Sequence, residues 1–292
     1  MSNKMEEYIE TINEALDKFL EIKYPEEIFK SMRYSVLSEG KRLRPILCLE
    51  ACRVLGGKIE DAIPTACAIE MLHAQSLIHD DLPCMDNDDF RRGKPTNHKV
   101  FSEATAVLAG DALLTFAPQL IIQQSKNLSD KTKLRLLEEY CLAAGAYGLI
   151  AGQVVDIESE GKKISSQTLE FIHTHKTADL FKFALKEGAI IARADEARIL
   201  AMQEFAQKIG FAFQICDDVL DETSTFEKLG KTLGKDKEAQ KPTYTAIFGL
   251  EKAREEVICL LNASYDIMAK HGIKSEIFSE IIDGIKERAE SC

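Results

Sequence analysis

Apolar residues recur at spacings of three and four along most of the chain. One such stripe consists of Tyr8, Ile9, Ile12, Ala15, Leu16, Phe19 and Leu20, and a second of Met202, Phe205, Ala206, Ile209, Phe213 and Cys216. This spacing places apolar side chains on one face of an α-helix. Few stretches alternate between apolar and polar residues, so the pattern predicts a protein that is helical nearly throughout.

Turn-forming residues separate the helical stripes. They fall near Pro25 and within 55–64, 126–131, 159–166 and 270–275. Neither a tandem repeat nor a change of composition marks a linker. The simplest interpretation is one all-α domain over residues 1–292, folded as a single large bundle of roughly ten or more helices.

Composition and charge narrow the function. The chain has 292 residues, of which 45% are hydrophobic, and a formal net charge of −11. An acidic chain without a dominant basic stripe is not expected to bind nucleic acid. The N-terminus is polar and gives no export signal, and none of the eight cysteines forms a C-x-x-C pair. We therefore expect reduced thiols and a cytoplasmic location.

One segment is apolar enough to suggest a membrane span. It covers residues 104–122, but Asp111 and Pro118 interrupt it. A buried helix of a large bundle explains the segment better, with Asp111 as a buried, hydrogen-bonded acid. We therefore expect no stable membrane insertion.

An acidic motif is followed directly by cations in residues 79–99, HDDLPCMDNDDFRRGKPTNHK. The acids are Asp80, Asp81, Asp86, Asp88 and Asp89, and the cations are Arg91, Arg92 and Lys94. The amphipathic helix predicted over 69–79 ends at these acids, and Pro83 prevents an ordinary continuation of it. The chain must bend there, which can bring Asp86 back toward Asp80.

A second acidic motif lies in residues 214–222, QICDDVLDE. Gln214, Asp217, Asp218 and Asp221 have the spacing of one helix face. One such cluster alone would more often be a solvated acidic surface. Two helix ends with acids facing each other across a cavity would instead suit several Mg²⁺ ions, which prefer hard oxygen ligands.

Cations stand beside both acidic motifs. Arg91 and Arg92 follow the first motif, and Lys231 and Lys235 follow the second. Upstream, the segment EGKRLRP at 39–45 adds Lys41, Arg42 and Arg44. Guanidinium groups match phosphate oxygens, and bound metal lets an acidic protein hold an anion. The combination predicts a site in which Mg²⁺ and Arg hold a polyphosphate.

These motifs resemble one enzyme family. The segments GKRLRP, HDDLPCMDNDDFRRGKPTNHKVF, HKTADLF and FQICDDVLDETS…LGKTLGKD are similar to those of the short-chain trans-polyprenyl diphosphate synthases. The pattern is most similar to bacterial farnesyl diphosphate synthases (geranyltranstransferases) and plant-type geranylgeranyl diphosphate synthases, and it covers about residues 38–254.

The resemblance implies a fold and a reaction. The implied fold is an all-α bundle of the trans-isoprenyl diphosphate synthase type with a central cavity, present as a homodimer. The implied reaction is the head-to-tail condensation of isopentenyl diphosphate with an allylic diphosphate, with Mg²⁺ as cofactor and three ions expected when substrate is bound.

The resemblance also implies roles for single residues. Asp80, Asp86 and Asp217 would be the main Mg²⁺ ligands, supported by Asp81, Asp218 and Asp221. Arg91, Lys176 and Lys231 would bind the allylic diphosphate, and Gly40, Lys41, Arg44, His73 and Arg92 would bind isopentenyl diphosphate. Lys176, Thr177 and Gln214 would be the catalytic residues, with Thr177 and Gln214 facing the developing cation. Gln153 and Asp156 would either orient these ligands or satisfy a helix junction.

Two positions depart from the family pattern. Glu39 replaces the first of two usual glycines, and Gln75 stands five residues before Asp80, where farnesyl-specific bacterial relatives place an aromatic residue. Because Gln75 neither closes nor clearly opens the pocket, product length stays open. We expect the C15 product, farnesyl diphosphate, with geranylgeranyl diphosphate as the alternative. A terpene cyclase would not need the GKRLRP segment, and an inactive regulatory subunit would not need both acidic motifs.

Overall fold

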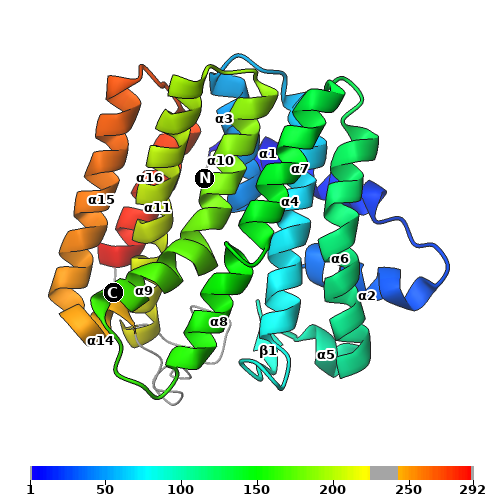
Figure 1. Ribbon diagram of the computed structural model, residues 1–292, viewed down its shortest axis with the longest axis horizontal. Helices are drawn as coiled ribbons and strands as arrows, with labels where there is room; N and C mark the ends of the chain where they lie inside the picture. The colour runs from blue at the N-terminus through cyan, green and yellow to red at the C-terminus, as the bar shows by residue number, and fades with distance from the viewer. Residues whose placement is uncertain (1, 224–242, 291–292) are drawn as a thin grey trace.

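The computed structural model describes residues 2–223 and 243–290, and in this part the chain is almost entirely helical (Figure 1). The elements before the acidic turn are α1 (Asn3–Phe19), α2 (Glu26–Val36), α3 (Leu43–Val54) and α4 (Ile59–Asp80). Those between the two acidic motifs are β1 (Phe90–Arg91), β2 (Lys94–Pro95), α5 (Asn97–Val100), α6 (Glu103–Gln124), α7 (Asp130–Ala144), α8 (Leu149–Ser159), α9 (Ser166–Ile172), the π-helix η1 (His173–Ala178) and α10 (Asp179–Ile191). The last are α11 (Glu196–Thr223), α14 (Tyr244–Phe248), α15 (Leu250–Lys270) and α16 (Glu276–Glu290).

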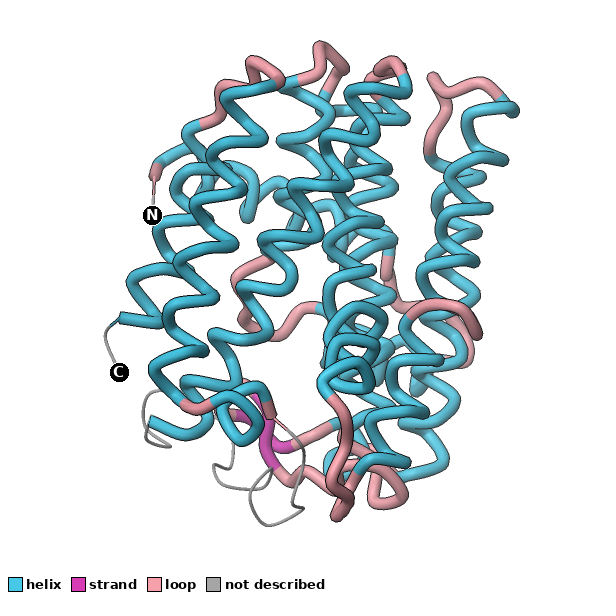
Figure 2. Tube along the Cα trace, turned by 60° about the vertical axis from the view of Figure 1, so that its left-hand side comes forward, coloured by secondary structure: helices cyan, strands magenta, loops and turns pink. Residues whose placement is uncertain are grey.

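The long helices run side by side as one bundle, and the short β1–β2 hairpin lies at one end (Figures 1 and 2). The all-α fold expected from the periodicity is confirmed. The single-domain prediction over 1–292 also includes residues 1, 224–242 and 291–292, which lie outside the described part.

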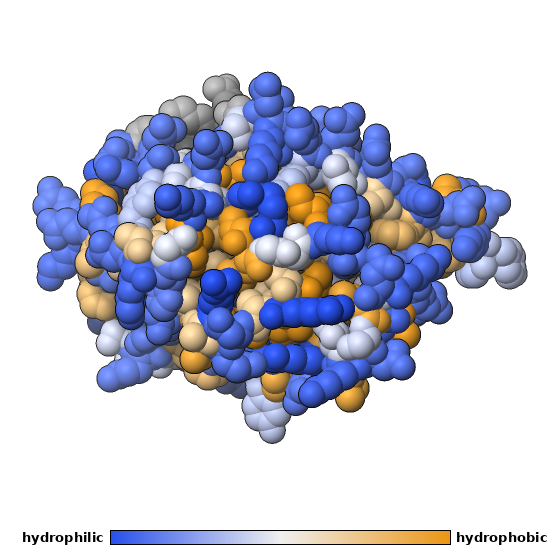
Figure 3. All heavy atoms as spheres, turned by 90° about the horizontal axis from the view of Figure 1, so that it is seen from above, coloured by the Kyte–Doolittle hydropathy of each residue, from blue (hydrophilic) through white to orange (hydrophobic). Residues whose placement is uncertain are grey.

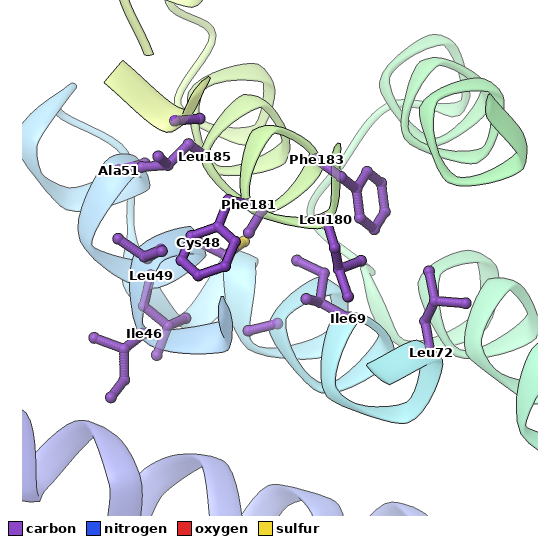
Figure 4. Close-up of a cluster of buried hydrophobic side chains, with 14 of the residues drawn as sticks. Ile46, Cys48, Leu49, Ala51, Ile69, Leu72, Leu180, Phe181, Phe183 and Leu185 are labelled. Atoms are coloured by element: carbon purple, nitrogen blue, oxygen red, sulfur yellow. The ribbon is translucent and has the colours of Figure 1, made fainter. Parts of the chain in front are cut away.

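The core forms where α3, α4 and α10 meet. Ile46 and Leu49 of α3, Ile69 and Leu72 of α4, and Phe181 of α10 are buried there (Figure 4). Removing large apolar side chains from water is the main stabilising term of such a bundle. The packed helices hold the C-terminal end of α4 and the start of α10 in fixed positions, and predicted site residues lie at that end of α4 and in η1, directly before α10.

The end of the bundle away from the hairpin carries no acidic motif. Figure 3 views this end, where apolar side chains gather in the centre and polar side chains surround them. The first acidic motif lies at the opposite end, where α4 finishes and β1 and β2 begin.

The helix expected over 104–122 is α6, and its burial is only partial. Ala106, Leu113 and Leu120 are buried against the bundle, whereas Leu108 is exposed. Asp111 is exposed as well, so the expectation of a buried acid was wrong, because it lies on the outer side of α6. By length and composition, both α6 and a stretch over 130–159 could cross a membrane; 39% and 33% of their most apolar windows are buried.

Candidate active site

The first acidic motif folds back on itself after α4. The backbone N–H of Asp86 donates to the carbonyl of Asp80 over 2.9 Å, and that of Asp88 donates to the carbonyl of Asp81 over 3.2 Å. Pro83 lies within this turn, as the sequence led us to expect. The turn brings Asp86 back beside Asp80 at the end of the bundle.

A tight hairpin presents the two arginines that follow. Phe90 pairs with Pro95 and Arg91 with Lys94, and the connecting residues Arg92 and Gly93 have φ values of 53° and 74°. Positive φ at both central positions is typical of a type I′ turn, which matches the twist of the two strands. The guanidinium of Arg91 donates from Nε to Oδ1 of Asp81 over 2.6 Å.

Asp81 is paired and almost completely buried, with 3% of its surface exposed. Burial raises the pKa of its carboxyl to about 6, although Arg91 opposes the shift. Asp81 and Asp88 both contact Arg91. The carboxyl of Asp81 therefore holds the hairpin in place, whereas Asp80 lines the cavity described below.

Lys176 and Thr177 lie in the π-helix η1, where each turn contains more residues than an α-turn. Such widened turns often occur at functional sites. The ammonium of Lys176 is 2.5 Å from Oδ2 of Asp156 and 3.8 Å from Oδ2 of Asp80. Burial lowers the pKa of Lys176, but Asp80, Asp156 and Asp86 outweigh it and raise the pKa above the usual value. Lys176 is therefore a fixed cation beside the first motif.

The close approach of α8 to η1 depends on Gly152. A Cβ atom on Gly152 would lie 2.3 Å from the backbone nitrogen of Lys176. From the next position of α8, the amide of Gln153 donates to Asp80, while Asp156 accepts from Lys176. These contacts favour the interpretation that Gln153 and Asp156 orient site residues over that of a simple helix junction.

The second acidic motif lies near the end of α11. Asp217 accepts a hydrogen bond of 3.0 Å from Nη2 of Arg288, a residue of α16. Asp218 is buried, and its carboxylate accepts from the Gln214 amide over 3.0 Å and from the backbone N–H of Tyr244 over 2.7 Å. Thr177 in turn donates to the Gln214 carbonyl over 2.6 Å. Asp218 thus fixes Gln214, and Gln214 and Thr177 meet at the cavity.

One cavity of about 320 Å³ brings many of the predicted residues together. Nine of them line it, namely Arg44, His73, Asp80, Arg91, Arg92, Lys176, Thr177, Gln214 and Asp217. Its apolar walls come from Leu77, Leu149, Leu180, Phe213 and Leu220. The sequence predicts two acidic helix ends that face each other across a cavity, and Asp80 at the end of α4 and Asp217 of α11 line this one.

The other predicted residues lie around this cavity. Asp81 faces a smaller neighbouring space, and Lys41 lines a larger cavity of about 1100 Å³ next to α16. Gly40, Asp86, Asp218 and Asp221 are not among the lining residues. Lys231, like Lys235, lies outside the described residues.

Arg44, Arg92 and the imidazole of His73 form what we call the cationic side of the cavity. Arg44 places its guanidinium 4.7 Å from the ring centroid of Phe181, and its Nε has no hydrogen-bond partner among the described residues. Burial lowers the pKa of Arg44 to about 10, and Glu70 opposes the shift. Burial, Arg44 and Arg92 lower the pKa of His73 well below its usual value. His73 is therefore a neutral partner among fixed cations.

Sequence reasoning missed Arg288. It lies near the C-terminus in IKERAE, which belongs to none of the recognised motifs. Its guanidinium pairs with Asp217 and lies 5.5 Å from the ring centroid of Phe213, and it lines both cavities. No local pattern could have placed this residue, because α16 reaches the site only through the packing of the whole bundle.

Gln75, the residue that bears on product length, is buried and contacts His79. The amide of Gln75 lies 3.1 Å from Nδ1 of His79, and His79 Nε2 lies 3.1 Å from the carbonyl oxygen of Val107 on α6. Ser76, not Gln75, lines the cavity one turn before Asp80.

The donor set fits Mg²⁺ held jointly by protein and ligand. No three His, Cys, Asp or Glu side chains of the described residues form a metal-binding group by themselves. Asp80 and Asp217 nevertheless line one cavity, each beside a cation that offsets its charge. Mg²⁺ keeps several waters and commonly shares its ligands between one or two carboxylates and substrate phosphates. The residues present therefore fit such an ion.

Comparisons with known proteins assign the chain to a family. The family model described as polyprenyl synthetase matches residues 25–281. The chain is 50% identical over 246 residues to a chloroplastic geranylgeranyl pyrophosphate synthase of Catharanthus roseus, a match that covers 84% of this chain and 69% of that protein.

Two solved structures have the same fold. A geranyltransferase from Helicobacter pylori, complexed with magnesium and isoprenyl diphosphate, superposes with a TM-score of 0.84 at 31% identity, covering 98% of this chain and 97% of that one. An FPP/GFPP synthase from Zymomonas mobilis gives a TM-score of 0.81 at 32% identity, covering 99% and 96%.

The contact between α8 and η1 yields a prediction. Replacing Gly152 with alanine should lower the free energy of unfolding by about 1–3 kcal/mol, because the new methyl group must push α8 away from the Lys176 backbone. Urea denaturation of wild type and variant measures the change.

Gly284→Ala is the matched control. A Cβ atom at Gly284 meets nothing within 4 Å, so alanine should raise the helix stability by about 0.5–1 kcal/mol. An equal and small effect of both substitutions would contradict the close approach inferred for Gly152.

Proposed function

The chain belongs to the polyprenyl synthetase family and is a prenyltransferase, and on that premise we propose that it lengthens an allylic diphosphate with isopentenyl diphosphate. The observation that carries the proposal is the single cavity lined by Asp80 and Asp217 together with the cations Arg44, Arg91, Arg92 and Lys176. An enzyme that ionises an allylic diphosphate needs acidic side chains to hold the metal ion and cationic side chains to bind the phosphate groups.

The first step breaks the bond between the allylic carbon and the diphosphate oxygen. Asp80, Asp86 and Asp217 would hold Mg²⁺, which neutralises the charge that develops on the leaving diphosphate. The magnesium in the Helicobacter geranyltransferase complex supports Mg²⁺ as the cofactor. We predict that three Mg²⁺ ions are bound when substrate is present. Asp81, Asp218 and Asp221 support these ligands. Asp81 does so by holding Arg91, and Asp218 by holding Gln214.

Fixed cations bind the allylic diphosphate itself. Arg91 and Lys176 line the cavity, and both are held in place by carboxylates before any substrate arrives. Lys231 completes the predicted set but lies outside the described residues. Because these cations are already oriented, they stabilise the departing charge with little reorganisation.

The allylic cation forms beside oxygen atoms and apolar walls. The Gln214 carbonyl and Thr177 hydroxyl meet at 2.6 Å and offer oxygen dipoles to the positive charge. Leu77, Leu149 and Leu180 line the same cavity and help to exclude water, which would otherwise capture the cation as an alcohol.

Isopentenyl diphosphate would bind on the other side of the cavity. Arg44, His73 and Arg92 supply two cations and a neutral imidazole there, and Lys41 would reach the diphosphate from the neighbouring larger cavity. Gly40 would give close access to the backbone. The terminal alkene carbon attacks the allylic cation, a new carbon–carbon bond forms, and a proton is lost. The released diphosphate accepts that proton, so no side chain is needed as a general base.

Geranylgeranyl diphosphate is the product we propose. Ser76 and Leu77, the α4 residues that line the cavity within about one turn of Asp80, are not aromatic, while Phe213 of α11 is an aromatic residue of the same lining. The Catharanthus relative, at 50% identity, is named for this C20 product. Farnesyl diphosphate, expected from the sequence, remains the second candidate. The Zymomonas FPP/GFPP synthase supports it.

We further propose a homodimer formed through the outer face of α6. Val107, Leu108 and Ile122 are 41%, 59% and 49% exposed there, while the other side of the helix packs into the bundle. Exposed apolar faces of this kind mark contacts between subunits.

Packing of α6 on α4 as part of the bundle supports a protein without stable membrane insertion. A cytoplasmic location and the lack of a nucleic-acid partner stay predictions.

Removing a metal-binding acid should abolish turnover. Asp80→Asn and Asp217→Asn should each lower the rate of condensation by at least about 1000-fold, because ionisation loses electrostatic stabilisation of about 4 kcal/mol or more. A radiolabelled isopentenyl diphosphate assay at saturating Mg²⁺ measures the rate. Asp283→Asn, which changes an acid of α16 that contacts Tyr265, is the control. Near-normal turnover by Asp80→Asn would refute the assignment.

Product length should respond to Ser76. We expect wild type to form mainly C20 product from isopentenyl and dimethylallyl diphosphates, and Ser76→Phe to form mainly C15, because an aromatic ring would shorten the cavity. Chromatography of the dephosphorylated products measures the distribution. Gln75→Phe is the comparison variant. A dominant C15 product from wild type would favour the farnesyl alternative, and no product at all would favour an inactive subunit.

A charge on the outer face of α6 should separate the subunits. Leu108→Glu is expected to raise the dimer dissociation constant at least about 100-fold, because burying the carboxylate in an apolar interface is costly. Sedimentation velocity measures the dissociation. Leu200→Glu, at another exposed apolar position, is the control. A wild type that is monomeric at micromolar concentration would exclude the dimer.

A further inference from the structure

A buried ion pair lies directly behind the cationic side of the cavity. Nη1 of Arg42 donates to Oε1 of Glu70 over 2.7 Å, and the two side chains are 2% and 3% exposed. The same guanidinium donates from Nε to the Asn13 side chain and from Nη2 to the Ser38 carbonyl, each over 2.9 Å. Neither Arg42 nor Glu70 lines the cavity that holds Asp80 and Asp217.

The ion pair fixes an unusual backbone conformation. Arg42 has φ 48° and ψ 31°, which is the left-handed region that residues with a side chain rarely adopt. It immediately precedes α3, so the chain changes direction between Lys41 and Arg44. Such strain persists only where surrounding contacts hold it. Three hydrogen bonds from the Arg42 guanidinium supply that hold.

The same contacts reach Arg92 on the β1–β2 hairpin. Nη1 of Arg92 lies 3.4 Å from the Ser38 hydroxyl, and Ser38 is the residue whose carbonyl accepts from Arg42. A Cβ atom on Gly40 would lie 2.7 Å from Nη1 of Arg92, so the guanidinium rests on the Gly40 backbone. Glu70, Ser38 and Arg92 share the lining of one small cavity of about 40 Å³.

Glu70 is a carboxylate close to Arg44 and Arg92, the cations that would bind the diphosphate of the second substrate. Its charge acts on Arg44 and Arg92, opposing the lowering of the pKa of each by burial. By its field alone, a carboxylate at this point would weaken the binding of a diphosphate. Its location is useful only if it holds Arg42 and the neighbouring cations in their places before the anion binds.

We propose that Glu70, through Arg42, is a positioning residue of the isopentenyl diphosphate site. It sets the turn that separates Lys41 from Arg44 and the contact that holds Arg92 against Gly40. This inference rests on the proposed function, since it takes these cations as the binding site of the second substrate. The allylic site, built on Arg91 and Lys176, does not depend on Glu70.

The proposal predicts whether Glu70→Gln weakens or tightens the binding of isopentenyl diphosphate. Glu70→Gln removes the negative charge, so a purely electrostatic effect would tighten isopentenyl diphosphate binding. A positioning role has the opposite consequence, because Arg42 loses its ionic partner and the turn loosens. We expect the dissociation constant for isopentenyl diphosphate to rise at least about tenfold, while that for the allylic substrate changes less than about threefold.

Isothermal titration calorimetry measures the dissociation constant for isopentenyl diphosphate. The allylic site is first filled with a non-reacting allylic thiolodiphosphate and Mg²⁺, and isopentenyl diphosphate is then titrated into the protein. The KM of each substrate provides a second measurement. Asn13 is partly exposed and accepts a hydrogen bond from Arg42. Asn13→Ala removes this acceptor and should also raise the dissociation constant for isopentenyl diphosphate, by a smaller factor than Glu70→Gln. It keeps the test decisive if Glu70→Gln folds poorly.

Glu50→Gln is the matched control. Glu50 is also a completely buried acid, and it accepts from Arg53, Tyr8 and Ser275 away from the cavity. Its substitution should lower thermal stability but leave the dissociation constant for isopentenyl diphosphate within twofold. Unchanged or tighter binding by Glu70→Gln would overturn the positioning role. A wild type that neither binds nor condenses isopentenyl diphosphate would overturn the proposed function instead.

Discussion

Opposite charges held close together in a poorly solvated space are the constraint on which the site depends. Acids of the two motifs would repel each other if they met alone. The described residues relieve this by pairing Asp81 with Arg91, Asp80 with Lys176 and Asp217 with Arg288. The pairs of Asp80 with Lys176 and of Asp217 with Arg288 join segments that are distant in sequence. The same contacts therefore fix the hairpin, η1 and α16 around one cavity, and they leave cations in place for an incoming diphosphate.

Much of this arrangement was readable from the sequence. Apolar residues at spacings of three and four gave the helical fold, because each helix must bury one face. Pro83 gave the turn after Asp80, since proline cannot continue a helix. Motif order and residue type indicated Mg²⁺ and diphosphate chemistry. Each of these signals is determined by a few residues that are close together in the sequence.

The remainder depends on packing that no local pattern records. Arg288 reaches Asp217 from the last helix, and only the stacking of α11, α15 and α16 brings it there. Distance along α4 draws attention to Gln75, but it does not show that this side chain contacts His79 while Ser76 lines the cavity. Asp111 was expected inside because its neighbours are apolar, but α6 turns it outward. For Gln75 and Asp111, the rotation of the helix about its axis decides which way the side chain faces.

The π-helix has a consequence for how the chain can vary. Neighbouring residues of an α-helix point about 100° apart, yet Lys176 and Thr177 both face the cavity. The wider turn accommodates one residue more than an α-turn and so shifts the phase between α9 and α10. Deleting a single residue from 173–178 would restore a regular helix. That deletion would force a choice between keeping Phe181 in the core and keeping Lys176 beside the acids, so the length of this segment is as constrained as its composition.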